Sequence, residues 1–252
     1  MKKITHFVYP YIIPKDPKFG WELMYSIRSL YKFFEGEFDV TIIGEIPEWI
    51  NTTAITCIKF DNSKDYNRKE NRINQKILKA ASMYDEFVSI HDDMYLMRPA
   101  TIEDFKDHRY HQTFKDDYTS EEVLSRLKGF SRTIHNTCSK IRELGYEYRY
   151  NYVMHTPYFY ETKNIYKMLL KVNMLDDSRR GYIFEQMYFA LTSNKYTKTT
   201  DDYKFGMYGK PGLPTKDILF FSHDEMGYLK DNRILNYLST NFNVACRAEK
   251  IF

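Results

Sequence analysis

The first hundred residues alternate between short apolar segments typical of strands and longer segments with helical periodicity. Strands that alternate with helices of about a dozen residues form βαβ units, in which helices cover both faces of a mostly parallel sheet. The alternation predicts an α/β fold and places any ligand at the carboxyl ends of the strands. The predicted strands cover residues 4–8 (ended by Pro10), 38–44, 54–60 and 87–90, and the predicted helices cover residues 21–34 and 73–84.

The second half of the chain is less regular. Its patterns predict a long helix over residues 120–144 that is broken at Gly129, helices over 164–172 and 182–193, and a strand over 218–221. A loop rich in glycine and proline, residues 206–214, is either a mobile lid or an ordinary surface connection. The sequence shows no internal repeat, low-complexity tract or Gly/Ser linker, which favours a single domain over residues 1–252.

Composition and charge narrow the class of protein. The 252 residues include 37 basic and 34 acidic side chains, and the resulting net charge of +3 is too small to require a nucleic-acid partner. No apolar run reaches the roughly 18 residues of a membrane span, and none follows the N-terminal lysines as in a secretory signal. With three scattered cysteines, we expect a cytoplasmic protein with reduced thiols and no stable membrane association.

The most informative segment is an apolar strand that runs directly into two adjacent acids, Asp92 and Asp93, and then into a second apolar stretch. Two carboxylates at the end of a buried strand repel each other unless a cation offsets their charge. A divalent ion such as Mn²⁺ or Mg²⁺, held by one or two carboxylates and by phosphate oxygens, supplies that offset. A solvated turn is the alternative interpretation of the dipeptide, but its apolar flanks favour the metal site.

This segment resembles the Asp-x-Asp region of GT-A glycosyltransferases, in which the motif closes a strand and holds a metal on the nucleotide-sugar diphosphate. Residues 25–30, 40–51 and 91–99 also resemble, in order, segments of the Stealth-type sugar-phosphate transferases of capsule assembly. The resemblance implies a GT-A-like domain with a nucleotide-sugar and metal half over about 1–105. The acceptor half, with a C-terminal lid, would cover about 106–252.

The GT-A resemblance also implies contacts to the donor. In these enzymes the helix before the metal strand often contacts the nucleotide, and amide groups at its start favour phosphate. A late histidine often completes the metal sphere, which implies His223 beside Asp93, and Lys210 in the glycine-rich loop would reach the diphosphate. A solvated helix face and a structural histidine are the alternatives. The helix residues concerned are Arg68, Arg72, Asn74 and Lys76.

Two acids are candidates for direct roles in the reaction. An enzyme that inverts the anomeric centre needs a base near the acceptor hydroxyl. Residues 181–186 resemble the segment in which inverting GT-A enzymes place an acid at the start of a helix, which implies Glu185 as that base. Asp92 would hold the donor, or exchange roles with Asp93. A solvent-facing Glu185 and a retaining reaction, which needs no such base, remain open.

The function predicted is metal-dependent transfer of a sugar from a nucleotide sugar to a hydroxyl group. The alternatives are a Stealth-type sugar-1-phosphate transferase and a carbohydrate- or nucleotide-binding module without turnover. The Lys-, Asn- and Tyr-rich composition is typical of phage proteins, so the acceptor is either a hydroxymethylated base in DNA, in the host cytoplasm, or a glycan. Residues 142–152 interleave basic and aromatic side chains as a DNA-contacting strip would, although an aromatic sheet edge explains them too.

Overall fold

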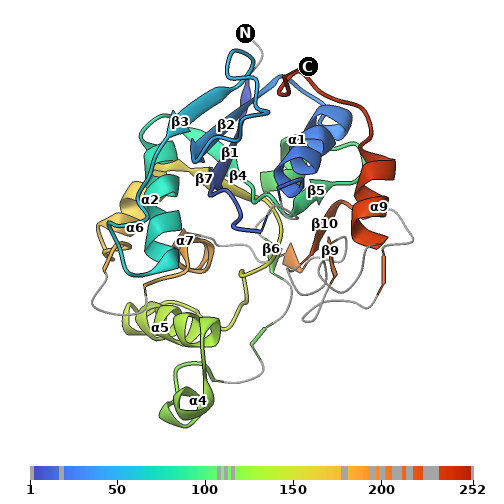
Figure 1. Ribbon diagram of the computed structural model, residues 1–252. Coiled ribbons are helices and arrows are strands. Elements are labelled where there is room, and N and C mark those ends of the chain that lie inside the picture. The colour runs from blue at the N-terminus through green and yellow to red at the C-terminus, as the bar shows by residue number, and fades with distance from the viewer. Residues whose placement is uncertain are drawn as a thin grey trace.

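A five-stranded sheet lies at the centre of the computed structural model (Figure 1). Its strand order is β3-β2-β1-β4-β7, and every strand is parallel to its neighbours except β7, which runs antiparallel to β4. The strands are β1 (Thr5–Tyr11), β2 (Phe38–Gly44), β3 (Thr56–Lys59), β4 (Glu86–Ser89) and β7 (Tyr158–Glu161). The structure describes residues 3–16, 20–106, 109–110, 113–114, 117–176, 181–192, 197–198, 202–205, 212–213, 218–223 and 233–250.

Helices α1 (Glu22–Phe33) and α2 (Lys69–Ala81) connect the parallel strands. The chain moves from β1 outward to β2 and from β3 back to β4, so right-handed crossovers place the two helices on opposite faces of the sheet (Figure 1). Helix α1 buries Leu23, Ile27 and Leu30, which recur at helical spacing and join the main core. The predicted mostly parallel α/β architecture is confirmed.

A second, three-stranded sheet joins distant parts of the chain. Strand β5 (Met94–Leu96) pairs antiparallel with β10 (Phe220–His223), which in turn pairs parallel with β9 (Asp202–Phe205). Helix α9 (Arg233–Asn241) covers this sheet, where Ile234 and Leu238 pack in one cluster with Tyr95 and Phe221. Strands β6 (Arg109–Tyr110) and β8 (Thr197–Lys198) form a separate parallel pair.

Among the remaining helices, α4 and α5 lie below α2 in Figure 1, whereas α6 lies beside it. The predicted helix over residues 120–144 is two helices, and the break falls at Gly129, whose φ of +52° favours glycine. Within the described residues, no helix combines the length and apolar character needed to cross a bilayer. The helices are α3 (Glu103–Lys106), α4 (Glu121–Arg126), α5 (Phe130–Glu143), α6 (Thr162–Leu169) and α7 (Phe184–Thr192).

A largely buried ion pair ties the segment after α9 to α1. The Arg28 guanidinium donates to both carboxylate oxygens of Glu249, at 2.8 and 2.6 Å, and a third bond reaches the Phe242 carbonyl at 2.8 Å. The same segment bonds to the loop after β2, since the backbone nitrogen of Asn51 donates to the Ala248 carbonyl. Two motifs of the Stealth resemblance, residues 25–30 and 40–51, therefore meet around this segment.

Candidate active site

The two adjacent acids lie where the strand order of the main sheet reverses. Residues 90–93 link the end of β4 to β5, and the backbone nitrogen of Ile90 donates to the carbonyl of Val8 in β1. From β1 the chain continues toward β2 on one side, and β4 lies on the other. The crevice at such a reversal is where open α/β sheets bind ligands. We call residues 91–93 the acid turn.

Buried serines of α1 hold the acid turn in place. The Ser26 hydroxyl donates to the carbonyl of Met94 at 2.5 Å, and the Tyr9 hydroxyl lies 2.9 Å from the same Ser26 oxygen. One turn along the helix, the Ser29 hydroxyl accepts a bond from the backbone nitrogen of Leu96 at 2.9 Å. Both serines are fully buried, and these bonds fix the backbone on the far side of the acid turn against α1.

The environments of the two acids separate their pKa values. Burial, followed by the negative charge of Asp93, raises the pKa of Asp92 to about 7. Burial alone would also raise the pKa of Asp93, but the charge and hydrogen bond of His155 outweigh it, with help from His91 and His223, and lower that pKa. The Nδ1 atom of His155 lies 3.1 Å from an Asp93 carboxylate oxygen. Near neutral pH, Asp93 is therefore ionised, whereas the Asp92 carboxyl is protonated in a large fraction of the molecules.

The acid turn has part of the donor set that a divalent cation needs. The Oδ1 atom of Asp93 is buried and has no hydrogen-bond partner among the described residues. Carboxylate and imidazole ligands suit Mn²⁺, and His91 is neutral near pH 7 because burial lowers its pKa to about 4. Within the described ranges, no three His, Cys, Asp or Glu side chains lie together as a group that could hold a metal ion. The residues fit an ion that also takes oxygens from a bound diphosphate.

His223 lies beside the acid turn, although 130 residues separate them in the sequence. The antiparallel register pairs Phe221 with Tyr95 and Ser222 with Met94, so His223 and Asp93 both lie next to the last pair of the register. The His223 ring is buried, with Nε2 3.0 Å from the Tyr95 hydroxyl and 3.6 Å from a carboxylate oxygen of Glu22. Strand β10 ends at His223 itself, two residues later than the sequence predicts.

The four α2 side chains predicted to contact the nucleotide have different surroundings. Arg68 is exposed at the start of α2, while Arg72 donates from Nε to the Tyr66 carbonyl. The structure differs from the nucleotide contact predicted for Asn74. Its buried amide donates to the carbonyls of Met174 and Tyr182 and so holds α2 against that segment. Lys76 is buried as well.

The Lys76 ammonium donates to the carbonyl of Tyr11 at the carboxyl end of β1, at 3.0 Å. Burial lowers the pKa of Lys76 to about 8. The group therefore lies under the strand ends, on the inner side of α2, rather than on the outer face where a solvated lysine would be found. Lys210, the remaining predicted cation, lies outside the described residues.

Two residues that the sequence analysis did not select lie at the acid turn. Lys69, the first residue of α2, is exposed, and its charge opposes the rise that burial and Asp93 produce in the pKa of Asp92. His155 precedes β7 and contacts Asp93. The start of a helix next to a basic pair, Arg68 and Lys69, was a usable signal for the first residue, whereas the sequence analysis found no signal for the second.

Glu185 belongs to the same cluster of charges. Burial, together with the charge of Glu70, raises the pKa of Glu185 to about 7, while the charge of His155 acts in the opposite direction. The neighbouring Gln186 is buried, accepts from the backbone nitrogen of Tyr152 and donates to the carbonyl of Tyr150. Gln186 therefore holds the chain before β7, and Glu185 is the acid that the start of α7 brings toward His155.

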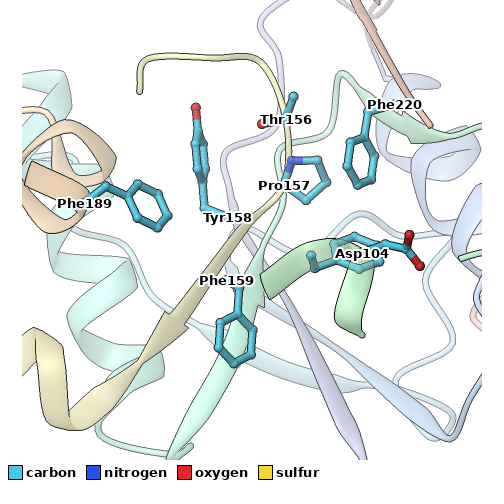
Figure 2. Close-up of a pocket in the computed structure, with 8 residues that line it drawn as sticks. Asp104, Thr156, Pro157, Tyr158, Phe159, Phe189 and Phe220 are labelled. Carbon is cyan, nitrogen blue, oxygen red and sulfur yellow. The ribbon is translucent and has the colours of Figure 1, made fainter. Parts of the chain in front are cut away.

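The described cavities do not hold the acid turn. Figure 2 shows Phe189, Tyr158, Phe159 and Phe220 around Thr156 and Pro157, enclosing a space of about 10 Å³, which is enough for one water molecule. A larger apolar groove of about 550 Å³ lies along Leu78 and residues 169–175 and contains none of the predicted site residues. The position of the candidate site is thus inferred from the end of β4 and from the charged side chains around it.

The strip over residues 142–152 does not present unpaired basic groups to a nucleic acid. Arg149 is paired with Glu147 through two nitrogens, at 3.0 Å each, and Arg142 donates to the Thr119 hydroxyl. Tyr152 is fully buried, and Tyr148 donates to Asp117. This corrects the expectation of a DNA-contacting strip and favours the alternative, an aromatic edge packed on the core.

Solved structures with the same architecture include the galactosyltransferase LgtC in complex with donor and acceptor sugar analogs. That structure has a TM-score of 0.51 and 10% sequence identity, over 97% of this chain and 98% of the other. The chain has the GT-A-like fold of LgtC. An active-site mutant of LgtC matches over the same shares of both chains, with a TM-score of 0.50 and 12% identity.

The likeness to LgtC lies in the fold and not in the sequence. No protein-family model matches the chain, and no curated protein sequence is significantly similar to it. The comparison supports the GT-A part of the resemblance noted in the sequence and gives no support to the Stealth part. At 10–12% identity, the residues of LgtC are not transferred to this chain.

Proposed function

We propose that the chain is a metal-dependent glycosyltransferase that moves a sugar from a nucleotide sugar to a hydroxyl acceptor. The observation that carries the proposal is the acid turn at the strand-order reversal, where a charged Asp93 keeps one buried oxygen without a partner among the described residues. LgtC, which shares the fold, has been solved with donor and acceptor sugar analogs. A divalent ion, Mn²⁺ or Mg²⁺, would neutralise charge that develops on the diphosphate of the donor.

The side chains around the acid turn take separate roles in this proposal. Asp93 and His223 hold the cation, and Asp92 holds the ribose or sugar of the donor. Lys69, with Arg68 behind it, faces the diphosphate from the start of α2, where the helix amides also favour an anion. Glu185 accepts the proton of the acceptor hydroxyl. The donor side is residues 1–105, and later residues supply the acceptor side, with either a glycan or a modified DNA base as acceptor.

Nucleotide release tests the proposed reaction directly. The full chain is incubated with Mn²⁺ and a panel of nucleotide sugars, first alone and then with glycans or hydroxymethylated DNA, and the products are identified by mass spectrometry. A nucleoside diphosphate and a glycosylated acceptor are expected. A nucleoside monophosphate would instead identify the sugar-1-phosphate transferase, and donor binding without any turnover would identify a binding module.

Lys69→Ala is expected to weaken binding of the donor by about 10- to 150-fold, because the variant loses one hydrogen bond or ion pair to a charged group, which contributes about 1.5–3 kcal/mol. The measurement is titration calorimetry with the donor that the release assay identifies, in the presence of Mn²⁺. Lys79→Ala is the matched control, since Lys79 lies in the last turn of the same helix. Equal affinities for the two variants would remove Lys69 from the donor site.

The transfer rate is expected to rise with pH up to about 7 and then level off. Glu185 acts as a base only when ionised; with its pKa at about 7, the ionised fraction falls tenfold for each pH unit below 7. The measurement is kcat from pH 5 to 9 at saturating substrates. Asp92 has a similar pKa and could produce the same pH dependence. The control is therefore the pH dependence of the residual rate of Glu185→Gln. If the kcat of that variant still rises with pH up to about 7, Glu185 is not the base.

A further inference from the structure

The surroundings of His223 contain a buried carboxylate that the proposed roles leave unused. Glu22, the first residue of α1, is 7% exposed and lies 3.6 Å from Nε2 of His223 through its Oε1 atom. The Tyr95 hydroxyl lies 3.0 Å from the same nitrogen. The negative charge of Glu22 also acts nearby on Tyr11, where burial, followed by the charges of Asp92 and Glu22, raises the pKa of the phenol.

We propose that Glu22 is a positioning residue that keeps the ring proton of His223 on Nε2, so that Nδ1 carries the lone pair for a divalent cation. The inference rests on the proposed function, because it assumes that His223 serves the cation held at Asp93. The ring is neutral in both of its tautomers, so the effect is a choice between two positions of one proton and not a change in charge.

Hydrogen-bond chemistry explains why the carboxylate decides between the tautomers. An ionised carboxylate only accepts hydrogen bonds, whereas a tyrosine hydroxyl both donates and accepts. At 3.6 Å the charge of Glu22 stabilises a proton on Nε2 by electrostatic attraction, and the Tyr95 oxygen, at 3.0 Å, accepts the hydrogen bond from that proton. Without the charge of Glu22, the Tyr95 hydroxyl can donate to Nε2, which moves the ring proton to Nδ1.

The position of His223 gives this choice a consequence for metal binding. The β5–β10 pairing ends with Ser222 opposite Met94, and His223 and Asp93 are the next residues of the two segments at that end. A histidine binds a metal through the nitrogen that carries the lone pair, and a carboxylate on the other nitrogen fixes the tautomer and orients the ring. Changes to such a supporting carboxylate typically cost about 10–100-fold in metal affinity.

The tautomer can be measured without any metal. In protein labelled with ¹⁵N at histidine, long-range ¹H–¹⁵N spectra distinguish a protonated Nε2 from a protonated Nδ1, and His223→Gln identifies the signal of His223 by its loss. The wild-type chain is expected to show the Nε2-protonated form. Glu22→Gln, which keeps the size of the side chain, is expected to lose that single signature. Tyr95→Phe is the matched control and should retain it.

Manganese affinity, measured by electron paramagnetic resonance with Mn²⁺ alone, gives the second readout. Glu22→Gln is expected to bind Mn²⁺ about 10–100-fold more weakly than wild type, with an unchanged melting temperature in metal-free buffer, and Tyr95→Phe to stay within about threefold. The inference about Glu22 is overturned if the wild-type ring is protonated on Nδ1, or if Glu22→Gln keeps both the tautomer and the affinity of the wild type. Either result leaves the proposed function standing. If the wild-type chain does not bind Mn²⁺ with or without donor, the metal dependence of the proposed function fails as well.

Discussion

Asp93→Asn is expected to lower the rate of sugar transfer by about a thousandfold or more, equivalent to roughly 4 kcal/mol of transition-state stabilisation, while the fold stays intact. The substitution keeps the size of the side chain but removes the charge that faces the cation. It also ends the repulsion between the two acids, which offsets the lost contact to His155. The rate is measured with saturating donor and Mn²⁺, and the fold by thermal melting.

The exposed Asp65, in the turn before α2, supplies the matched control, and Asp65→Asn should retain full activity. Asp92→Asn is expected to reduce the rate severely as well, because the donor loses one of its ligands. If Asp93→Asn retains most of its activity in Mn²⁺, the acid turn does not hold a metal, and the proposed function loses the observation on which it depends.

Gly44→Ala is expected to destabilise the fold by roughly 3–5 kcal/mol, from a strained backbone together with a steric clash. Gly44 ends β2 with a φ of +141°, and an added Cβ atom would lie 1.9 Å from the carbonyl oxygen of Tyr11, its partner in β1, and 3.3 Å from Nζ of Lys76. The neighbour is backbone, so the contact is relieved only by separating the two strands. Urea unfolding followed by circular dichroism measures the loss.

Gly145→Ala separates the two causes of this destabilisation. Gly145 has a φ of +82°, but a Cβ atom there would meet nothing within 4 Å. Its variant should therefore lose only about 1–2 kcal/mol, the cost of the left-handed backbone. Similar losses for the two variants would mean that β1 and β2 can separate at Gly44 without a large cost.

Local patterns predicted the first half of the fold well. The helix over 21–34 and the strand over 38–44 match α1 and β2 closely, because an apolar helical stripe and a run of β-branched residues each point to one structure. The predicted end of the first strand at Pro10 is wrong, since β1 continues to Tyr11. The pairing of β1 with β4 stops at Val8, opposite Ser89, so the missing amide of Pro10 disrupts no bond to that strand.

Residue patterns alone predicted only the contiguous part of the candidate site, whereas His223 and Glu185 were expected from the GT-A resemblance. The acid pair stands out because two carboxylates interrupt an apolar run. His155 and Glu22 carry no such signal, since each becomes important through a strand or helix start that the fold brings to the acid turn. For Lys69 the only signal is the basic pair that it forms with Arg68 at the start of a helix. Strand β7 was missed because a short apolar run is ambiguous between helix and strand, and antiparallel pairing at a sheet edge leaves no mark in the sequence.

The pairing of β5 with β10 has a consequence for how the chain folds as it is synthesised. Tyr95 and His223, which contact each other across these strands, are 128 positions apart. At about 5–20 residues per second, roughly 6–26 s pass between the synthesis of the first strand and that of its partner. During that interval β5 has an uncovered edge next to two acids, whose charge discourages association with other nascent chains. We therefore expect the two carboxylates to discourage association of the unfinished chain in addition to the role proposed for them in the folded protein.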